Sequence, residues 1–420
     1  MHSFSYKEGQ FFAENVPIER IAQQVGTPLY IYSYTTFARH FQVFDGAFKD
    51  IPHITCYSCK ANPNLSLLKT VAALGGGVDI VSGGELYAAL AASIPPEKIV
   101  FSGVGKTEEE LAYAAKSRIA MINVESEDEL KVAARVGQKL RRQIPVSIRV
   151  NPEIDAKTHP YITTGLKKNK FGLLWNDARP LYDFMAANRW LDPVGISSHI
   201  GSQITEISPF TEAVQSLKRM VGELEQAGIT LRYMDIGGGL GITYKDELPP
   251  QPEEYARAVA SELTGTNLTL IMEPGRVIVG NSGIFVTRVL YVKKPGDKIF
   301  YVVDGAMNDL IRPSLYDAYH EIVPVRENKA EGVIADVVGP VCESGDFLAK
   351  GREMAPLKQG DLVAVMSAGA YGFSMSSNYN LRKRVPEVLV KDDSFFIVRK
   401  RERNADLLRG QSTPDFLESR

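Results

Sequence analysis

Polar residues end several short apolar runs of this chain, and two of them have side chains that suit covalent chemistry on a small molecule. Lys60 ends one run, and an amine that loses solvation among apolar and neutral neighbours is pushed towards its reactive neutral form. Such an amine can form a Schiff base with a carbonyl cofactor. Glu273 ends another run, and a carboxylate there could keep a pyridine nitrogen protonated, which makes the ring an electron sink. Alone, either residue is commonly structural, so the elements that position them decide between the two interpretations.

Glycines, a histidine and an arginine end or follow further runs of the same kind. The turn Gly237-Gly238-Gly239 would let backbone amides approach a phosphate closely. His199 could stack on a planar cofactor, and Ser202 could add a hydrogen bond to its phosphate. Arg276, in Glu273-Pro274-Gly275-Arg276, could bind a substrate carboxylate through two hydrogen bonds. The structural alternatives are a buried, satisfied histidine and an internal salt bridge at a turn.

The apolar runs themselves predict the elements that would bring these residues together. Eight strand-like runs occur, and a helix-like segment follows nearly every one; the runs are Ile54–Lys60, Gly77–Val81, Lys98–Gly103, Ile119–Val124, Pro145–Val150, Pro193–His199, Leu231–Gly237 and Leu268–Glu273. Strand then helix, repeated about eight times over roughly 220 residues, is typical of a (β/α)₈ TIM-like barrel. The carboxyl ends of the strands converge on one mouth in that fold, and Asp79 and Arg149 would stand there with the residues above.

Start signals and apolar stripes support the predicted helices between the strands. Thr107–Glu110 and Ser126–Glu129 both fit the capping box, in which a hydroxyl and a carboxylate three residues later each accept from the other's backbone amide. Within Asn64–Leu74, one apolar stripe would cover the barrel; its members are Leu65, Leu68, Val71 and Ala72. The segment Pro152–Lys170 is polar, rich in lysine and bears a glycine, which predicts a mobile loop at the mouth.

Beyond residue 280 the sequence changes to β-branched and aromatic runs with turn residues between them. The runs are Ile284–Val292, Lys298–Asp304, Glu321–Val325, Val333–Val338, Asp361–Ala368 and Glu387–Lys400. They predict an all-β module beside the barrel, and the extended run Pro28–Tyr32 is expected to join it. The predicted domains are therefore a cofactor-binding barrel over residues 34–280 and a β-rich domain formed by residues 1–33 and 281–420.

Composition narrows the class of protein. The 420 residues are 44% hydrophobic and 23% charged, with a net charge of −2, so there is no electrostatic footprint for nucleic acid. No apolar run is long enough to span a membrane, and the amino terminus lacks the apolar stretch of a signal peptide. An odd number of cysteines, three, suits a reducing cytoplasm better than a disulfide framework. These features predict a cytoplasmic metabolic protein.

Neither a metal site nor a redox pair is predicted. The six histidines show no paired spacing, so no metal ligands are assigned. Cys56 and Cys59 form a C-x-x-C, but residues three apart in a strand point to opposite faces, and no second pair completes a zinc set. We therefore interpret both as structural.

Taken together, the motifs resemble the fold-type III, alanine racemase-like pyridoxal-phosphate decarboxylases, and most closely their diaminopimelate-specific branch. The resemblance covers nearly the whole chain, from Thr27 to Tyr379. It rests on Tyr57-Ser-Cys-Lys60-Ala-Asn, His199-Ile-Gly-Ser202-Gln203, Asp235-Ile-Gly237-Gly238-Gly239-Leu-Gly241, Glu273-Pro274-Gly275-Arg276, Arg312-Pro-Ser-Leu-Tyr316, Cys342-Glu343-Ser and Gly369-Ala-Tyr371-Gly. Gln203 and the Arg312–Tyr316 segment are similar to the diaminopimelate enzymes, whereas ornithine decarboxylases carry a different set there.

The resemblance implies an activity and a role for each motif residue. Pyridoxal 5'-phosphate would be the cofactor and meso-2,6-diaminopimelate the substrate, decarboxylated to L-lysine and carbon dioxide in the last step of lysine biosynthesis by a homodimeric carboxy-lyase. Lys60 would bind the cofactor covalently, and Cys342 of the partner subunit would protonate the carbanion. The other implied cofactor contacts are His199, Ser202, Gly237, Gly238, Gly239, Glu273, Pro274, Gly275, Arg276 and Tyr371, and the implied substrate contacts are Arg276, Arg312, Tyr316, Glu343 and Tyr371.

Other functions on the same fold stay open at this point. An ornithine- or arginine-type decarboxylase would have no need for an anion clamp such as Arg276 with Arg312. A non-catalytic cofactor-binding relative would have no need to keep Lys60, Cys342 and Glu273 together. An alanine racemase-like activity is disfavoured by Glu273, because an arginine at that place would favour racemisation.

Overall fold

The computed structural model describes residues 2–154 and 170–417, and it separates into two compact units. One unit comprises Thr36–Ser282, and the other combines Met1–Thr35 with Gly283–Arg420. Most of the predicted loop over 152–170 lies outside the described residues. Each unit has its own hydrophobic core and its own strand pairing.

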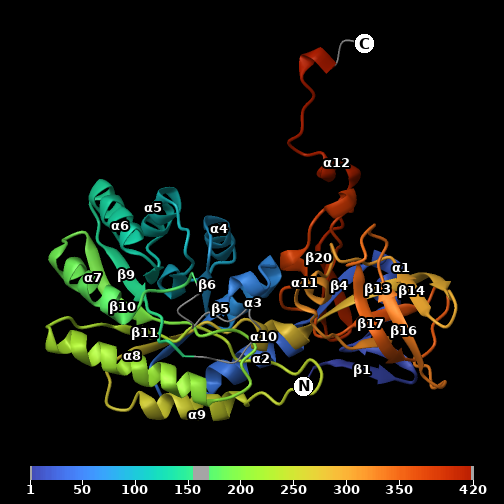
Figure 1. Ribbon diagram of the computed structural model, residues 1–420, viewed down its shortest axis with the longest axis horizontal. Coiled ribbons are helices and arrows are strands. Elements are labelled where there is room, and N and C mark those ends of the chain that lie inside the picture. The colour runs from blue at the N-terminus through green and yellow to red at the C-terminus, as the bar shows by residue number, and fades with distance from the viewer. Residues whose placement is uncertain (1, 155–169, 418–420) are drawn as a thin grey trace. The chain divides into compact units, whose positions relative to one another are not determined.

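The first unit is a closed barrel of eight parallel strands, which confirms the predicted fold class (Figure 1). Around the barrel the strands run β10-β11-β12-β5-β6-β7-β8-β9. Their bounds are β5 His53–Ser58, β6 Gly77–Ile80, β7 Ile99–Phe101, β8 Met121–Val124, β9 Ile144–Arg149, β10 Leu191–Ser197, β11 Tyr233–Asp235 and β12 Thr269–Met272. Each falls inside or beside a predicted run, because buried parallel strands are short and nearly continuous in apolar residues.

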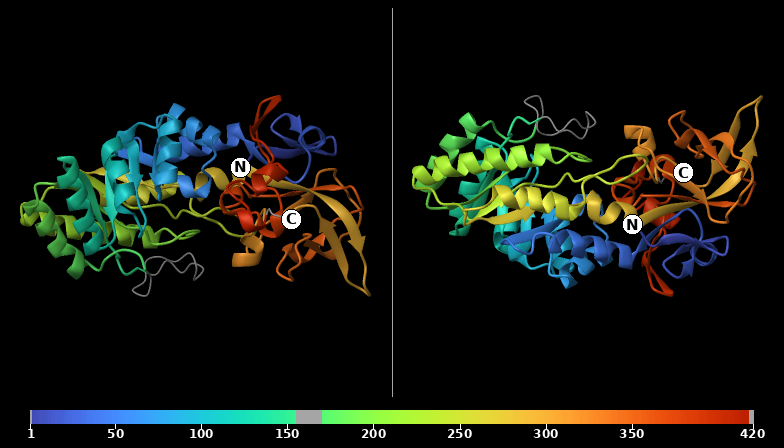
Figure 2. Two further views of the ribbon diagram at one scale, coloured as in Figure 1. Left: turned by 90° about the horizontal axis from the view of Figure 1, so that it is seen from above. Right: turned by 90° about the horizontal axis from the view of Figure 1, so that it is seen from below.

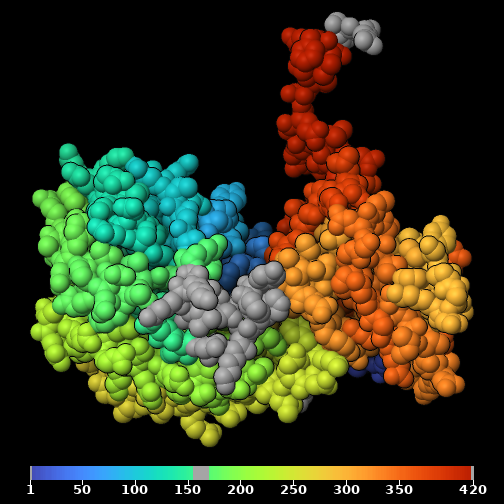
Figure 3. All heavy atoms as spheres, in the orientation of Figure 1, coloured from blue at the N-terminus to red at the C-terminus, as the bar shows by residue number. Residues whose placement is uncertain are grey.

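Helices follow the strands and cover the outside of the barrel. They are α2 Tyr34–Gly46, α3 Leu65–Ala73, α4 Gly83–Ala91, α5 Glu108–Ser117, α6 Glu127–Leu140, α7 Trp175–Ala187, α8 Ser208–Gln226, α9 Pro252–Glu262 and α10 Arg276–Val279. Two of the longer ones, α8 and α9, lie side by side in all views (Figure 2). The space-filling view shows one face of this unit, on which the colours run from blue through green to yellow (Figure 3).

The helix signals read from the sequence are partly right. Thr107 forms the full capping box with Glu110 at the start of α5. Ser126 does cap α6, but the Glu129 carboxylate accepts from the backbone amide of Glu125 instead of that of Ser126, so the second box is incomplete. The predicted stripe on α3 is also shifted, since Leu65 is 46% exposed while its neighbour Leu67 is buried. No helix among residues 2–154 and 170–417 is both long and apolar enough to cross a membrane.

Inside the barrel, an apolar layer lies below a polar one. Cys56, Val100, Met121 and Ile271 come from four different strands and pack in one core cluster. Because residues two apart in a strand share a face, the residues two positions later also point into the lumen. The resulting upper layer takes one buried residue from, or just after, each strand; these are Ser58, Asp79, Ser102, Asn123, Arg149, Ser197, Asp235 and Glu273. We call this set the polar ring.

The second unit is a β-rich module. Its main sheet has the order β17-β16-β14-β13-β4-β19-β20, with β18 pairing β13 and β15, and a small separate sheet of order β1-β2-β3. The strands are β1 Phe4–Lys7, β2 Gln10–Ala13, β3 Val16–Pro17, β4 Leu29–Ser33, β13 Gly283–Lys293, β14 Ile299–Val303, β15 Ile322–Pro324, β16 Val333–Val338, β17 Phe347–Met354, β18 Leu362–Val365, β19 Glu387–Lys391 and β20 Ser394–Arg399. Strand β4 pairs with β13 and β19, so the amino-terminal segment is part of this module.

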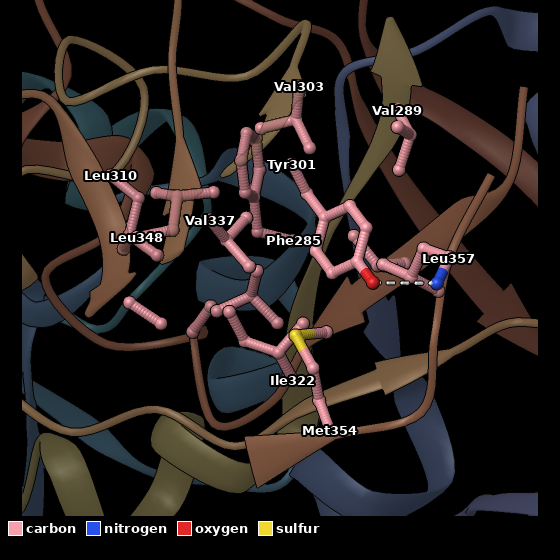
Figure 4. Packing of buried hydrophobic residues seen from close by; sticks show 14 of the residues in the cluster. Phe285, Val289, Tyr301, Val303, Leu310, Ile322, Val337, Leu348, Met354 and Leu357 are labelled. Atoms are coloured by element: carbon pink, nitrogen blue, oxygen red, sulfur yellow. Dashed lines mark hydrogen bonds between the residues drawn. The ribbon is translucent and has the colours of Figure 1, made fainter. Parts of the chain in front are cut away.

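Two features of the module escape the sequence patterns. Strand β17 was not among the predicted runs, because its polar Lys350 and Arg352 interrupt the apolar character. The run predicted over 387–400 is a hairpin, with β19 and β20 antiparallel. The main core of the β-rich module includes Phe285 and Tyr301. The Tyr301 hydroxyl accepts a hydrogen bond from the Leu357 amide at 3.0 Å (Figure 4). The buried tyrosine therefore has its polar end satisfied.

Candidate functional site

The polar ring is held together by hydrogen bonds that cross the barrel. Asn123 of β8 donates through Nδ2 to Asp235 Oδ2 of β11 at 2.8 Å, although two strands separate them. Ser102, after β7, donates to Oε1 of Glu273, after β12, at 3.0 Å. Such contacts form only when side chains from distant strands point into the lumen. The ends of the strands thus converge on one polar chamber, as the fold predicts.

Lys60 stands at this mouth but not in the surroundings the sequence suggested. It follows β5 in a short 3₁₀ turn, and its Nζ donates to Asp79 Oδ2 at 2.7 Å. The same oxygen accepts from the Ser58 hydroxyl at 2.8 Å. The expectation of apolar and neutral neighbours is therefore wrong, because a carboxylate at this distance stabilises the ammonium form. Its side chain is 34% exposed, so a small molecule can reach the nitrogen.

Glu273 lies in the same chamber and is buried. Burial raises the pKa of its carboxyl well above the usual range, and the carboxylates of Asp235 and Asp79 raise it further. Burial likewise raises the pKa of Asp235 to about 6. Glu273 therefore favours its protonated form more than an exposed carboxyl does. A basic ring nitrogen placed there would take up that proton and leave an ion pair.

The glycine turn after β11 approaches other backbone so closely that side chains are excluded. A Cβ on Gly238 would lie 2.2 Å from the Glu273 carbonyl oxygen, and one on Gly239 would lie 2.6 Å from the Gly201 carbonyl oxygen. The Gly238 amide donates to His199 Nδ1 at 3.2 Å, which leaves the imidazole proton on Nε2. Burial, with the nearby positive charges of Arg149 and Lys60, lowers the pKa of His199 well below its usual range, so the ring is neutral.

A methyl group at Gly238 should break this turn. We expect Gly238→Ala to weaken at least about tenfold the binding of the pyridoxal phosphate that the sequence resemblance implies, because a Cβ only 2.2 Å from the Glu273 carbonyl oxygen forces the turn to move. Fluorescence titration of the cofactor-free protein measures this. Gly222→Ala, in α8, is the matched control, since a Cβ there meets no atom within 4 Å. Equal affinities for the two variants would contradict the assignment.

Arg276 is joined to Ser202 and Tyr244. Its Nη2 donates to Ser202 Oγ at 3.1 Å and its Nη1 to the Tyr244 hydroxyl at 2.7 Å. The structure thus brings together Arg276 and Ser202, which the sequence predicts to bind substrate and phosphate. Pro274 and Gly275 separate Glu273 from Arg276 along the chain. A Cβ on Gly275 would lie 3.0 Å from Ser58 Cβ.

A second buried ion network supports the mouth from behind. The Lys106 side chain is fully buried, and its Nζ donates to the Gly103 and Asn123 carbonyls and to Glu129 Oε1 at 2.6, 2.6 and 2.7 Å. Arg149 pairs with Glu125 at 2.9 Å through Nη1. Lys106 therefore ties together the ends of β7 and β8, which carry Ser102 and Asn123.

Removing this lysine should destabilise the barrel. We expect Lys106→Met to lower the free energy of unfolding by about 3–5 kcal/mol, because Glu129 is left buried without its counter-ion. Both tryptophans, Trp175 and Trp190, lie in the barrel unit, so their fluorescence during urea unfolding follows that unit. Lys131→Met, which removes an exposed i,i+4 partner of Glu127, should change the value by less than about 0.5 kcal/mol. Similar losses for both variants would contradict the argument.

The remaining predicted residues lie in the β-rich unit. Arg312 is buried at the start of α11 (Arg312–Tyr316), and its Nε donates to His320 Nε2 at 3.2 Å. Cys342 and Glu343 are exposed, and the Glu343 carboxylate accepts from the Tyr379 hydroxyl. Tyr371 has a left-handed backbone with φ of 56°, which is unusual for a bulky residue. Tyr316, at the end of α11, is half-buried.

The two other cysteines are buried free thiols. Cys56 belongs to the apolar layer of the barrel, and its Sγ lies 3.6 Å from the Lys98 carbonyl. Burial raises the pKa of both thiols, so neither forms a thiolate at neutral pH. They fill the core, in agreement with the structural interpretation of the sequence.

Comparison with known proteins identifies the family. Residues 34–280 match the family model described as pyridoxal-dependent decarboxylase, pyridoxal binding domain. The chain is 50% identical over 409 residues to diaminopimelate decarboxylase of Vibrio cholerae, covering 97% of this chain and 98% of that one. The chain belongs to the diaminopimelate decarboxylase family. The corresponding enzyme of Pseudomonas aeruginosa is 48% identical, covering 98% and 99% of the two chains.

Solved structures of the family have the same fold. Diaminopimelate decarboxylase of Helicobacter pylori, in complex with L-lysine, superposes with a TM-score of 0.91 at 44% identity, covering 93% of this chain and 98% of that one. Together with the family match, this confirms the predicted family and its pyridoxal phosphate cofactor.

The barrel mouth also fits that cofactor on its own geometry. In the Gly238–Gly239 turn a Cβ would collide with the Glu273 or the Gly201 carbonyl oxygen, so the turn is bare backbone, and bare backbone allows amides to approach a phosphate closely. In the same chamber, Glu273 is a buried acid with a raised pKa and Lys60 a partly exposed amine. The cofactor requires three groups: an acid for its ring nitrogen, an amine for its aldehyde and a turn for its phosphate.

Ser102, Asn123 and Asp235 are among the members of the polar ring that received no role from the sequence. Each lies within two residues of the end of a predicted run, so the rule that identified Lys60 and Glu273 also points to them. Their residue types, however, are common at the ends of strands and carry no reaction of their own. Only the contacts across the lumen separate them from ordinary loop residues.

Proposed function

We propose that this protein is the pyridoxal phosphate-dependent enzyme that decarboxylates meso-2,6-diaminopimelate to L-lysine and carbon dioxide, the last step of lysine biosynthesis. The observation that carries the proposal is 50% identity over nearly the full length to a diaminopimelate decarboxylase, in a chain that keeps an amine and a buried acid in one chamber. The L-lysine complex of the Helicobacter pylori relative supports the expected product.

Lys60, His199 and Glu273 would hold the cofactor at the mouth. Lys60 would bind its aldehyde, His199 would stack on its ring as a neutral imidazole, and Glu273 would face the ring nitrogen. Its phosphate would lie on the glycine turn with Ser202 and the Glu273–Arg276 backbone. When bound, pyridoxal phosphate supplies an aldehyde for the substrate amine and a ring that takes up the electrons left by the departing carboxylate.

The protein's own groups would control protons around that ring. Burial favours the protonated form of Glu273, which would share its proton with the ring nitrogen and so favour a positive charge there. Asp79 holds the Lys60 nitrogen at 2.7 Å and would keep it in place beside the reacting atoms. The burial of this chamber strengthens both interactions.

The distal end of diaminopimelate would be read by charged groups of complementary sign. The substrate has two amino-acid ends, and the distal carboxylate would bind Arg276 and Arg312, while the distal ammonium would bind Glu343. Tyr316 and Tyr371 would complete this site. A substrate that lacks the distal carboxylate leaves the buried guanidinium groups of Arg276 and Arg312 without that counter-ion, at a cost of several kcal/mol. Ornithine, which lacks the distal carboxylate, should therefore be a poor substrate.

A direct assay tests the substrate assignment. Purified protein with added pyridoxal phosphate should release carbon dioxide from meso-diaminopimelate and form lysine. The rate with ornithine under the same conditions should be lower by about a hundredfold or more. A faster release of carbon dioxide from ornithine would contradict the assignment.

We also propose that the active form is a cytoplasmic homodimer in which Cys342 of one subunit protonates the carbanion in its partner's site. The exposure of Cys342 on its unit is compatible with this arrangement. Cys342→Ala should lower turnover about a hundredfold while cofactor binding is kept, because a proton donor is removed. Mixing Lys60→Ala and Cys342→Ala proteins should restore part of the activity, since hybrid dimers contain one site with both residues intact. Absence of rescue, with subunit exchange verified by mass spectrometry, would contradict the shared site.

A further inference from the structure

The hydrogen bonds that join Glu273 to Asp235 have a fixed direction. Asn123 donates through Nδ2 to two partners, Asp235 Oδ2 at 2.8 Å and Ser102 Oγ at 3.1 Å. Because the Ser102 oxygen accepts from Asn123, its own proton is directed at Glu273 Oε1, 3.0 Å away. The Asn123 carbonyl oxygen Oδ1 is buried and has no partner among the described residues. The Asn123 side-chain amide therefore uses its N–H donors in this network, while its carbonyl oxygen makes no hydrogen bond among the described residues.

The same bonds decide which of the two acids carries the negative charge. Both oxygens of Asp235 accept from N–H donors, because the Gly237 amide also donates to Oδ1 at 2.9 Å. Amide donors have no lone pair to accept from a protonated acid, so they favour the carboxylate form of Asp235. Glu273 accepts from a single hydroxyl in this network and is the acid that more readily holds a proton.

Two positive groups of the mouth are already paired with other acids. Lys60 lies 2.7 Å from Asp79, and Arg149 lies 2.9 Å from Glu125. These four groups come from the β5, β6, β8 and β9 sides of the lumen, His199 on the β10 side is neutral, and Arg276 donates to Ser202 and Tyr244. The acids of β11 and β12, Asp235 and Glu273, thus share a chamber in which Lys60 and Arg149 are each paired with a different acid. A cationic ring nitrogen is the partner that this pair of acids would stabilise.

We propose that Asp235 is a positioning residue which, through Asn123 and Ser102, places a fixed negative charge beside Glu273 and so keeps the proton on the cofactor's ring nitrogen. This inference rests on the proposed function, because it takes Glu273 as the partner of that nitrogen. Its physical basis is that an opposite charge close by stabilises the protonated ring. Asp235 does not touch the reacting atoms; it acts on them through Glu273.

The protonation of the ring nitrogen can be measured directly. Holoenzyme is reconstituted with pyridoxal phosphate carrying ¹⁵N in the ring, and the ¹⁵N chemical shift is followed with pH in the absence of substrate. In the unmodified protein the nitrogen should stay protonated between about pH 6 and 9, whereas in Asp235→Asn its pKa should fall by roughly one unit or more. In substrate assays kcat should fall about tenfold or more, with a smaller change in KM.

Two further variants separate charge from structure. Asp192→Asn makes the same chemical change at the start of β10, where Asp192 pairs with Arg232 on the surface, and it should leave the ¹⁵N titration unchanged. The exchange variant Asp235→Asn with Asn123→Asp returns one carboxylate to the lumen facing an amide, and it should restore most of the ring pKa. It also covers the case in which Asp235→Asn alone does not fold.

The outcomes distinguish this inference from the proposed function. Two results would overturn the role of Asp235. One is a ring-nitrogen titration that stays unchanged in folded Asp235→Asn holoenzyme. The other is a titration of the exchange variant that is shifted as far as that of Glu273→Gln. Either result leaves the decarboxylase assignment intact, since the unmodified enzyme would still release carbon dioxide from meso-diaminopimelate. Failure of the unmodified holoenzyme to do so would overturn the proposed function itself.

Discussion

Replacing Lys60 with alanine should abolish decarboxylation and the covalent attachment of the cofactor together. We expect kcat to fall by at least about 10³-fold, because the variant loses both the group that binds the aldehyde and a base positioned at the reacting centre. The absorbance band near the visible edge that a lysine-bound cofactor gives should disappear. Asp79 would remain buried without the partner that lies 2.7 Å from it, so some loss of stability should accompany the change.

The control for this experiment is another lysine of the barrel unit. Lys98→Ala removes an amine that donates to the Gly75 carbonyl, at the start of β7 and away from the carboxyl ends of the strands. Its activity and spectrum should match those of the unmodified protein. An unchanged absorbance band in Lys60→Ala, with the protein folded by circular dichroism, would show that another nitrogen holds the cofactor.

The sequence was sufficient for the barrel and for the residues at its mouth. Strand–helix alternation locates the eight strands to within a few residues, and in such a barrel the last residues of the strands must share one mouth. Lys60 and Glu273 could therefore be assigned from their residue types together with their places at the ends of two strands. Their immediate partners could not, because the stagger of a closed barrel decides which residues face each other across the lumen. The Asp79 carboxylate beside Lys60 is the clearest example.

Errors in the sequence analysis have similar causes. At Ser126 the predicted hydroxyl cap is present, but the predicted return bond from Glu129 is not. Buried Lys106 donates to one oxygen of the Glu129 carboxylate, and the Glu125 amide donates to the other. Strand β17 was missed because Lys350, Arg352 and Glu353 in its second half interrupt the apolar run. Local patterns describe a residue's own preferences, and they fail where a tertiary partner competes for its side chain.

Glu273→Gln should be the second most damaging change at the mouth. Glutamine keeps nearly the same shape and can still accept from Ser102, so the turn and the crossing hydrogen bond should survive. The amide carries no negative charge, however, and the ring nitrogen then loses the partner that keeps it protonated. We expect kcat for meso-diaminopimelate to fall about 10²–10³-fold, the loss typical of one preorganised electrostatic contact.

The pH dependence of this variant gives the mechanism a stricter test than the rate at one pH. Burial raises the pKa of Glu273, so in the unmodified enzyme this acid should share its proton with the ring nitrogen and help to retain it. In Glu273→Gln the nitrogen should lose its proton as the pH rises, and the gap in kcat between the two proteins should widen. Glu253→Gln, an exposed change in the first turn of α9, should follow the unmodified enzyme at every pH. A gap that stays constant with pH would mean that Glu273 acts through shape or packing rather than through charge.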